Sequence, residues 1–568
     1  MKRTLSLLVF SFSLWVSYAQ VAPITHPAIG SKAYSTDSSF CIELIGKKQY
    51  YAPTETTTAD KDINSPKSVN MHPNATKYYV NSLEGATTVV YDFKTNEKLK
   101  VIRHEFTDAD TVLLGKNFKP FYKFTHYLPD SKHPASPFGG WGAFYGKPVE
   151  STFTHGGKYL WVPYYRRDYD INAQDPSAVA IIDTETDSII RLMDTGPLPK
   201  MIATSPDGKL VAITQWGDNT VGIINIESEN PFDWHYTSLA IIDQKLELNF
   251  SMTKQIDRDN ESGYCPRGTA FTPDNHYLLV GCMAGKNEQS FGIAVVDLTT
   301  MQYLGRVTGN MYNMRHLLIR DGYVYLSINR DGYIQRMPLT QFLAAIPALK
   351  ASASKTTSLS GWENCKVGNG ARTIEFSPDG RYIYAACNAS STLYVVDTKA
   401  YQVVTSMAID SYPVGLEVSK DGRYVFTTSQ GRSNGGGNCV DIFHVYAPQE
   451  ERTELLRTSQ SWDGVELPPY LEGKPELVAV KYVFPAGKKV GWHHHPVMNY
   501  GVLLQGELTL IRQDGTTKVV HEGEAVVEMV DAIHRGENRG SKPVILYMFY
   551  LSQEGKELSI QHPEIPLE

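Results

Sequence analysis

The chain has 568 residues, which is too many for one compact hydrophobic core, so two or more domains are expected. Its formal net charge of −7 excludes a nucleic-acid-binding protein on charge grounds, and any cationic site must therefore be local. The 34 tyrosines suit β-structure and carbohydrate-binding surfaces alike.

Residues 1–19 have the layout of an export signal. Lys2 and Arg3 form a basic start, residues 5–15 are apolar, and a small-x-small cleavage site ends at Ala19. No later apolar run approaches the length of a membrane span. We therefore expect an exported protein, periplasmic or secreted. Export would allow the six cysteines to oxidise, but their spacings match no zinc pattern and decide no pairing.

A short sequence phrase recurs seven times between residues 62 and 447. Its clearest copy runs from Pro266 to Asp274 and joins a small, apolar strand to a Pro-Asp turn, with a basic residue six positions before the turn. After each turn comes a second strand, then a third that often ends in Asp, then an outer strand. Four short strands per repeat form the blade of a β-propeller. We predict an all-β fold with a seven-bladed propeller over 62–447, and residues 20–61 as a leader or a closing edge strand.

The repeats at 205–225 and 377–397 resemble the YVTN family of propellers, whose signature joins an S-P-D-G turn to an N-T-V-x-V-I-D strand. The resemblance implies the fold and says little about function, because propellers host many activities. Three blades carry insertions, at about 104–147, 229–263 and 340–366, and the last includes a short helical patch. Such insertions are either lids over a site or packing over a blade edge.

The residue six positions before each turn should lie at one mouth of the central channel, because the first strand of each blade lines the axis. Val149 and Val414 occupy two of these positions. The other five are basic: Lys67, Lys200, Arg267, Arg315 and Arg372. Loops on the same face add Arg166, Trp216 and Arg330.

Cations gathered in an acidic protein predict a bound anion held by Arg and Lys, and the neighbouring aromatic residues favour an anionic sugar. The alternative is that these cations pair with acidic side chains or carbonyls as structural residues. If the ligand is a uronate, Arg could neutralise its carboxylate while a Tyr or His removes the C5 proton and a group leaves C4. Oligogalacturonate and ulvan lyases are propellers with this chemistry, an analogy of fold alone. Candidate bases are His126, His155, Tyr264 and His316, each of which could equally be structural.

After a polar linker at 448–465, the pattern changes to strand runs around a histidine cluster over residues 466–568. The segment from about 470 to 555 resembles the cupin family, whose motifs are G-x5-H-x-H-x3-E-x6-G and G-x5-P-x-G-x2-H-x3-N. The matching residues are Gly487, His493, His495, Gly506, Gly523, His534 and Asn538. Met529 and Asp531 replace the usual Pro and Gly, and Asn499 stands where cupins usually place a Glu ligand. The resemblance implies a double-stranded β-helix, and a homodimer through it remains open.

Two histidines at i and i+2 on a strand point to one face, as His493 and His495 would. With His534 from a later strand they could form a facial set for one divalent transition metal, with open positions for substrate. Asn499 leaves either a three-His site or one with a weak amide ligand. Iron, manganese, nickel and zinc are all compatible, and three unrelated histidines are the alternative.

Three functions follow from these observations. The first is an exported carbohydrate-active enzyme, a lyase or other uronate-processing protein, that binds an anionic saccharide at the propeller mouth and carries a metal in the cupin. The second is a metal-dependent cupin oxygenase or isomerase of a small metabolite, with the propeller as scaffold. The third is a binding protein without turnover.

Overall fold

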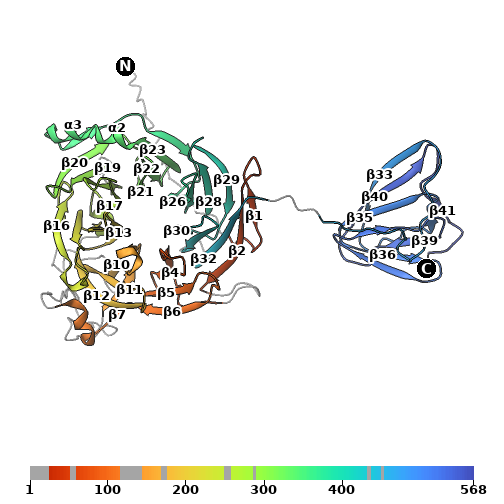
Figure 1. The fold of residues 1–568 in the computed structure, drawn as a ribbon, viewed down its shortest axis with the longest axis horizontal. Coiled ribbons are helices and arrows are strands. Elements are labelled where there is room, and N and C mark those ends of the chain that lie inside the picture. Colours follow the sequence, from red (N-terminus) through yellow and green to blue (C-terminus); the bar gives the residue numbers. More distant parts are fainter. Residues whose placement is uncertain are drawn as a thin grey trace, which may run out of the picture. The chain divides into compact units, whose positions relative to one another are not determined.

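A computed structural model describes residues 25–50, 59–115, 144–167, 176–247, 258–285, 290–431, 437–448 and 453–567. The chain divides into two compact units, 1–448 and 449–568. Both are built almost wholly from β-strands (Figure 1). The predicted fold class, an all-β propeller followed by a cupin, is confirmed.

The described part of the first unit contains seven antiparallel blades arranged in a ring (Figure 1). The first blade is β3 (Pro66–Met71), β4 (Lys77–Ser82), β5 (Thr87–Asp92) and β6 (Lys98–Arg103). The second is β9 (Thr152–Thr154), β10 (Tyr159–Arg167), β11 (Ser177–Asp183) and β12 (Ser188–Thr195), extended by β7 (Glu105–Phe106) and β8 (Phe144–Pro148). The third is β13 (Pro199–Thr204), β14 (Leu210–Gln215), β15 (Thr220–Asn225) and β16 (His235–Ile241).

The remaining blades repeat this order. The fourth is β17 (Pro266–Phe271), β18 (Tyr277–Cys282), β19 (Gly292–Asp297) and β20 (Gln302–Thr308), with β24 (Thr356–Ser358) parallel to β20. The fifth is β21 (Met314–Arg320), β22 (Tyr323–Ile328), β23 (Tyr333–Pro338) and β25 (Glu363–Lys366). The sixth is β26 (Ala371–Phe376), β27 (Tyr382–Cys387), β28 (Thr392–Asp397) and β29 (Gln402–Ala408). The seventh is β30 (Pro413–Val418), β31 (Tyr424–Ser429) and β32 (Cys439–Tyr446), completed by β2 (Cys41–Gln49) and β1 (Lys32–Tyr34).

Short helical segments occupy the connections. They are η1 (Asp108–Leu114), η3 (His155–Gly157), η4 (Pro231–Asp233), α1 (Arg258–Glu261), α2 (Leu339–Leu343) and α3 (Ile346–Ala351). The last two form the helical patch predicted in the third insertion, and Phe342 and Leu349 pack it against the fourth and fifth blades. No helix in the described residues is both long and apolar enough to cross a membrane.

The recurring sequence phrase builds the turn between the first and second strands. Ser205 Oγ donates a hydrogen bond to Asp207 Oδ1 (2.7 Å) and accepts one from Leu210 N (2.9 Å). Ser377 and Asp379 repeat this bond in the sixth blade. The glycine that follows each Asp has φ of 72°, a conformation in which a side chain is unfavourable. The phrase therefore recurs because its hydroxyl, carboxylate and glycine together close one tight turn.

The hydrophobic core lies between neighbouring blades. The second strand of each blade is covered on both faces, which is why residues such as Leu278, Leu279 and Val280 form a continuous apolar run that is fully buried. All six cysteines are described, and they are buried and unbridged. Their role in this structure is to fill the core.

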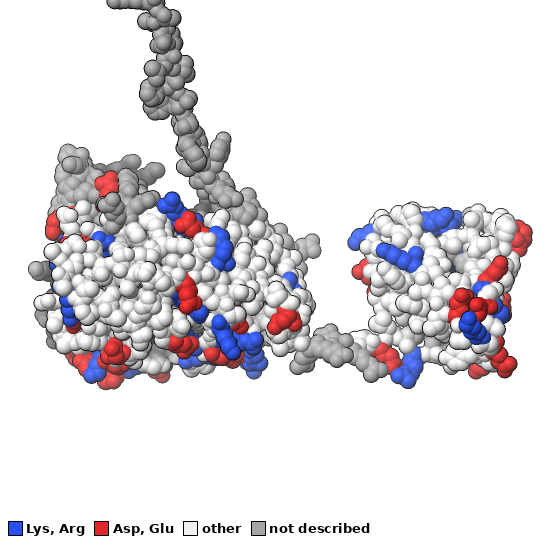
Figure 2. Space-filling view, turned by 90° about the horizontal axis from the view of Figure 1, so that it is seen from above, with Lys and Arg blue, Asp and Glu red and all other residues white. Residues whose placement is uncertain are grey.

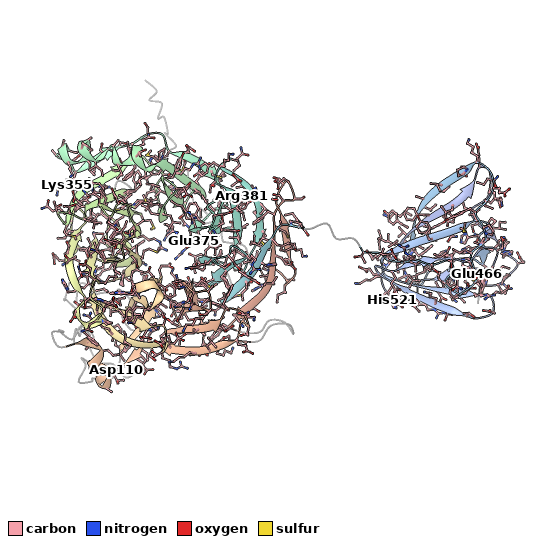
Figure 3. All side chains as sticks on the ribbon, viewed as in Figure 1. Asp110, Lys355, Glu375, Arg381, Glu466 and His521 are labelled. Atoms are coloured by element: carbon pink, nitrogen blue, oxygen red, sulfur yellow. The ribbon has the colours of Figure 1, made fainter. Side chains whose placement is uncertain are left out.

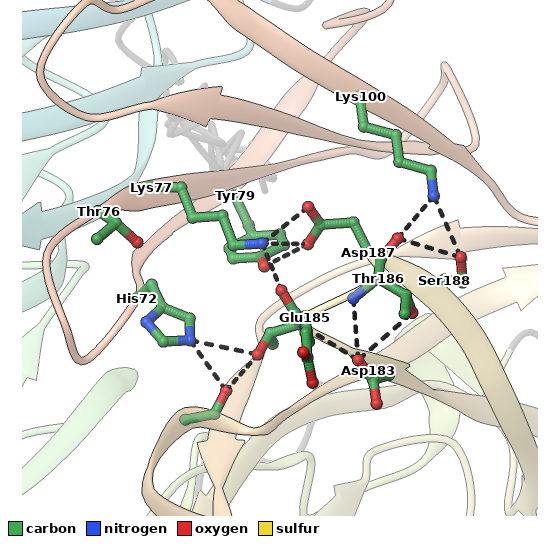
Figure 4. A network of polar contacts seen from close by, with 12 residues as sticks. His72, Thr76, Lys77, Tyr79, Lys100, Asp183, Glu185, Thr186, Asp187 and Ser188 are labelled. Atoms are coloured by element: carbon green, nitrogen blue, oxygen red, sulfur yellow. Dashed lines mark hydrogen bonds and ion pairs between the residues drawn. The ribbon is translucent and has the colours of Figure 1, made fainter.

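Polar contacts tie the first blade to the second (Figure 4). Lys77 Nζ lies 2.8 Å from both carboxylate oxygens of Asp187, and Tyr79 donates its hydroxyl to the same carboxylate at 2.6 Å. His72 Nε2 is 3.1 Å from the carbonyl oxygen of Gly157, in the turn of the next blade. These contacts link two neighbouring repeats. The hydrophobic pattern of the sequence does not by itself predict this link.

The ring is closed by an N-terminal strand. β2 pairs antiparallel with β32 and takes the place of the outer strand of the seventh blade. Lys47 on β2 forms an ion pair with Asp410, and its Nζ is 3.6 Å from Asp441 Oδ1 on β32. Both aspartates are fully buried, and Asp410 also contacts His26 at 2.7 Å. A buried charge cluster therefore holds the first and last parts of the propeller together.

The central channel contains two carboxylates on adjacent inner strands, Glu375 on β26 and Glu417 on β30. Glu375 lies toward the middle of the ring (Figure 3). Burial raises the pKa of Glu375, and burial together with the charge of Glu375 raises the pKa of Glu417 well above its usual range. Both side chains are half-buried, in surroundings that favour their neutral forms.

The second unit consists of two sheets packed face to face. One is β33 (Pro475–Phe484), β40 (Val544–Gln553), β35 (Met498–Gln505) and β38 (Ala525–Val527). The other is β37 (Thr517–His521), β36 (Glu507–Arg512), β39 (His534–Glu537), β34 (His493–His494) and β41 (Ile560–Gln561). Leu503, Leu510 and Leu546 lie in the core between the sheets.

Candidate functional site

Three histidines meet inside the second unit. His493 on β34 pairs with His534 on β39, and His495 follows two positions after His493. One ring nitrogen from each of the three lies within 4.8 Å of the others. The structure therefore brings together the three histidines predicted from the sequence, which are called the His cluster below.

Each ring of the His cluster is oriented by a backbone carbonyl. The Nδ1 atoms of His493, His495 and His534 lie 2.7, 2.7 and 2.9 Å from the carbonyl oxygens of residues 491, 558 and 532. Because a carbonyl oxygen only accepts hydrogen bonds, each Nδ1 carries the proton and each neutral ring keeps a lone pair on Nε2. Metal-binding histidines in proteins are held in this way.

Asn499, at the sequence position where cupins usually place a Glu ligand, carries an unsatisfied amide. Asn499, on β35, is 1 % exposed, and neither Nδ2 nor Oδ1 has a hydrogen-bond partner among the described residues. Leaving a buried donor or acceptor unpaired costs about 1–3 kcal/mol, so such groups usually serve a ligand, an ion or water. Asn499 is therefore placed to contact something bound beside the cluster.

A carboxylate that sequence reasoning missed lies against two of the histidines. Glu528 Oε2 is 2.9 Å from His495 Nε2, and its Oε1 is 3.7 Å from His534 Nε2. Burial alone would raise the pKa of Glu528, but the two imidazoles outweigh that effect and lower it. The sequence does contain a sign of this role: Glu528 is the one acidic residue in the otherwise apolar run 525–530. A charged side chain is rarely found in a buried strand without a partner.

The imidazoles differ in their electrostatics. Burial, and then the neighbouring His534, lower the pKa of His493 to about 4. Burial alone would lower the pKa of His534, but its contact with Glu528 raises it. His493 is therefore neutral, and able to donate its Nε2 lone pair, over the whole physiological pH range.

The first unit contains a cavity of about 450 Å³ at one mouth of the channel. Its lining includes all five predicted basic residues, Lys67, Lys200, Arg267, Arg315 and Arg372. Val149 and Trp216 also line it, together with Tyr165, Tyr312, Tyr412, Leu83, Met283, Ala284 and Gly285. This set of lining residues is called the channel mouth below.

Two cations of the channel mouth lie against a carboxylate. Glu150, next to Val149, forms an ion pair with Lys67 and lies 3.9 Å from Arg267 Nη2. Burial lowers the pKa of Lys67 well below its usual range, and burial with the charge of Arg315 lowers that of Arg267 to about 10. The described lining therefore holds more cations than carboxylates, in a setting where water stabilises them poorly. On the outer face shown in Figure 2, by contrast, positive and negative side chains are interspersed.

Aromatic rings hold one of these cations. Lys200 Nζ lies 3.9 Å from the ring centre of Tyr165 and 4.6 Å from that of Trp216. Contacts of this kind hold the ammonium group against the faces of the rings. Tyr312 and Tyr412, which the sequence reasoning missed, directly precede or lie close to the start of a first strand, as the basic residues do.

The remaining predicted residues of the propeller are placed elsewhere. Arg330 is not among the lining residues, but it stacks on Tyr312, with 5.4 Å from its guanidinium carbon to the ring centre. Val414 is buried without lining the cavity. The side chain of Arg166 and the whole of His126 lie outside the described residues.

The three described candidates for the catalytic base do not line the channel mouth. His316 is half-buried on β21 with Nδ1 3.0 Å from the carbonyl oxygen of Ile374, and desolvation lowers its pKa to about 4. His155 lies in η3, at the far end of β9 from Val149, and stacks on Trp234. Tyr264 packs against Arg306.

Comparison with known proteins agrees with the His-cluster geometry. Residues 480–550 match the family model described as "Cupin domain". The C-terminal unit contains a cupin domain. Cupins commonly bind a metal, and His493, His495 and His534 form a cluster that could hold one.

One curated relative is Antigen Lp49 of Leptospira interrogans serogroup Icterohaemorrhagiae serovar copenhageni. It is 22 % identical over 209 residues, which cover 34 % of this chain and 41 % of the relative. The match therefore spans less than half of either protein.

Two solved structures resemble about two thirds of this chain. They are the Kuenenia stuttgartiensis hydrazine synthase (13 % identity, TM-score 0.45, 69 % of this chain and 99 % of that one) and the Myceliophteria thermophila Cps50 (Swd1) β-propeller domain (10 % identity, TM-score 0.42, 67 % and 96 %). Both likenesses are too weak to carry a conclusion about function.

Proposed function

We propose that this protein is a metalloenzyme whose chemistry takes place in the cupin domain and whose propeller binds an anionic saccharide of the uronate type. The observation that carries the first part is the His cluster. Its three Nδ1 atoms are tied to carbonyls, and one ring nitrogen of each histidine lies within 4.8 Å of the others. His493, His495 and His534 would hold one divalent transition metal, with iron, manganese, nickel and zinc all suited to imidazole ligands. Such a metal supplies Lewis acidity and open positions for a substrate oxygen.

The residues around the cluster would position the substrate. Asn499 offers an unpaired amide, whose Nδ2 can donate two hydrogen bonds and whose Oδ1 can accept two. The ring of Tyr550 lies 5.6 Å from that of His495, and its hydroxyl contacts Tyr482 at 3.1 Å. Both groups are buried, so hydrogen bonds to a bound substrate would be strengthened by the exclusion of water.

The channel mouth supports the binding of an anion. Arg315 and Arg372 offer planar groups that match a carboxylate, and Lys200 presents a charge between two rings on which a sugar could pack. Elimination at this mouth has less support, because His155, Tyr264 and His316 are not among the residues that line the cavity. We therefore assign binding to the propeller and turnover to the cupin.

Further parts of the proposal rest on the sequence. We propose that the chain is exported to the periplasm or secreted through the signal at 1–19, which lies outside the described residues. The repeats are proposed to be of the YVTN type, and the cupin domain to pair as a homodimer.

The test of turnover is a spectrophotometric trace of acidic oligosaccharides, saturated and pre-unsaturated, at the ultraviolet band of 4,5-unsaturated uronates. We expect that band to fall with unsaturated substrates and the fall to stop when a chelator removes the metal. A rise with saturated substrates would instead place elimination at the channel mouth. No change with either would overturn the uronate proposal and favour a cupin oxygenase, an isomerase or a binding protein.

The test of binding is Lys200→Met. We expect this variant to bind acidic oligosaccharides at least about tenfold more weakly in calorimetry, because a charge-assisted hydrogen bond contributes about 1.5–3 kcal/mol. The control is Lys209→Met, because Lys209 pairs with Glu227 on the surface with 56 % of its side chain exposed. Equal affinities for the two variants would exclude the channel mouth as the saccharide site.

A further inference from the structure

We propose that Glu528 is the acidic ligand of the cupin metal, and that the carboxylate which cupins usually carry at the position of Asn499 has moved to the strand opposite. The inference rests on the proposed metal centre. It concerns which residues of this chain complete that centre, and it gives the site three neutral imidazoles and one carboxylate.

The strand register explains how a carboxylate at position 528 can take the place of one at position 499. β35 and β38 run antiparallel, with Tyr500 opposite Val527 and Gly501 opposite Val526. One step further along the same register, position 499 faces position 528. Directly opposed residues point to the same side of a sheet, with Cβ atoms about 4.5–5.5 Å apart. A carboxylate at 528 can therefore reach the volume that a carboxylate at 499 would reach.

The contacts of Glu528 are with the metal-binding atoms themselves. Its two oxygens approach His495 and His534 at Nε2, the nitrogen that each ring leaves free, and its side chain is 9 % exposed. The close contact to His495 is not a well-aligned hydrogen bond, because that Nε2 remains without a hydrogen-bond partner among the described residues. The carboxylate therefore faces the point on which the imidazole lone pairs converge.

Charge balance favours coordination over a permanent His–Glu ion pair. When both imidazoles are neutral and give their Nε2 lone pairs to a metal, they can no longer donate a proton to Glu528. A buried carboxylate left without a partner would be strongly unfavourable, and the cation at the centre is the one group able to compensate it. Asn499 lies opposite Glu528 and carries no charge, so its amide is left to form hydrogen bonds with water or substrate.

The experiment is a cross-strand exchange in the full chain, with metal affinity as the readout. Zn²⁺ affinity is measured by competition with a chromogenic chelator, and geometry by the visible spectrum of the Co²⁺-loaded protein. We expect Glu528→Gln to lower affinity at least about tenfold and to change the Co²⁺ spectrum. The double variant Asn499→Glu with Glu528→Asn should return affinity to within a few-fold of the original. Glu554→Gln is the control, because it removes one exposed carboxylate of the same domain.

The possible results distinguish a wrong assignment of Glu528 as a ligand from the failure of the proposed metal centre. If Glu528→Gln binds Zn²⁺ with unchanged affinity and gives the same Co²⁺ spectrum, Glu528 is not a ligand, although the metal centre stands. If the double variant has a normal melting temperature but still binds Zn²⁺ weakly, a carboxylate at position 499 cannot replace the one at position 528. If the unaltered protein binds neither Zn²⁺ nor Co²⁺, the proposed metal centre itself fails. The Co²⁺ spectrum is recorded at saturating metal, where the site is filled even if Glu528→Gln lowers the stability of the fold. A changed spectrum then reports a changed ligand set and not a loss of folded protein.

Discussion

Replacing His493 with alanine is expected to lower the affinity of the cupin domain for divalent metal at least about 100-fold, because one of three imidazole ligands is lost. His493 is the informative member of the cluster because His495 and His534 also contact Glu528, and their loss would leave that carboxylate without a partner. Its own Nδ1 bonds only the carbonyl of Gly491 in the described structure, so the substitution disturbs little else.

The matched control is the neighbouring residue. His494 follows His493 on β34, but its ring contacts His562, with 2.8 Å between Nδ1 and Nε2, and belongs to the other face of the strand. His494→Ala should therefore retain the metal. The measurement is the metal content of the purified protein together with the metal-dependent rise in its melting temperature. A ligand present at about 1,000 times its Kd stabilises a fold by about 4 kcal/mol. An equal rise in both variants would mean that His493 is not a ligand.

Replacing Lys47 with methionine is expected to destabilise the propeller by about 3 kcal/mol, near the lower end of the values for breaking a buried ion pair. Lys47 is the one cation in contact with two fully buried carboxylates, Asp410 and Asp441, within the described structure. Burial, and then the charge of Asp410, raise the pKa of Asp441 well above its usual range, so this residue can remain protonated and limit the loss. Among the described residues, Asp410 would keep only His26 as a basic neighbour.

The effect should depend on pH in a defined direction. Burial would raise the pKa of Asp410, but hydrogen bonds from His26 and Asp441, with the charge of Lys47, lower it. An acid whose pKa is lower in the folded state stabilises the fold above its unfolded pKa of about 4, and this contribution is lost as the pH falls further. Urea unfolding at pH 7 and at pH 3 measures the difference, which should be larger at pH 7.

The control for Lys47 is a surface pair on the same sheet. Lys32→Met removes a partly exposed contact with Glu43, and exposed ion pairs contribute about 0–1 kcal/mol. If Lys47→Met unfolds at the same urea concentration as Lys32→Met, the buried cluster does not hold β2 in the ring.

The sequence by itself determined the repeating elements and the three histidines. The turn built from Ser205, Asp207 and Gly208 is local, so its recurrence could be recognised without knowing which strands pair. His493 and His495 alternate along one strand, which places them on one face whatever the rest of the domain does. Likewise, basic residues near the start of five inner strands predicted the five cations of the channel mouth, because the same position in every blade reaches the same end of the ring.

Only the tertiary structure decided how distant strands pair. β2 closes the ring by pairing with β32, nearly four hundred residues away, and Glu528 faces Asn499 through the register of two strands that are not consecutive. The same holds for His155, Tyr264 and His316, whose side chains turn to Trp234, Arg306 and Ile374 rather than to the cavity. Hydrophobic period and turn chemistry act over a few residues, whereas partner choice and register depend on packing among all the strands together.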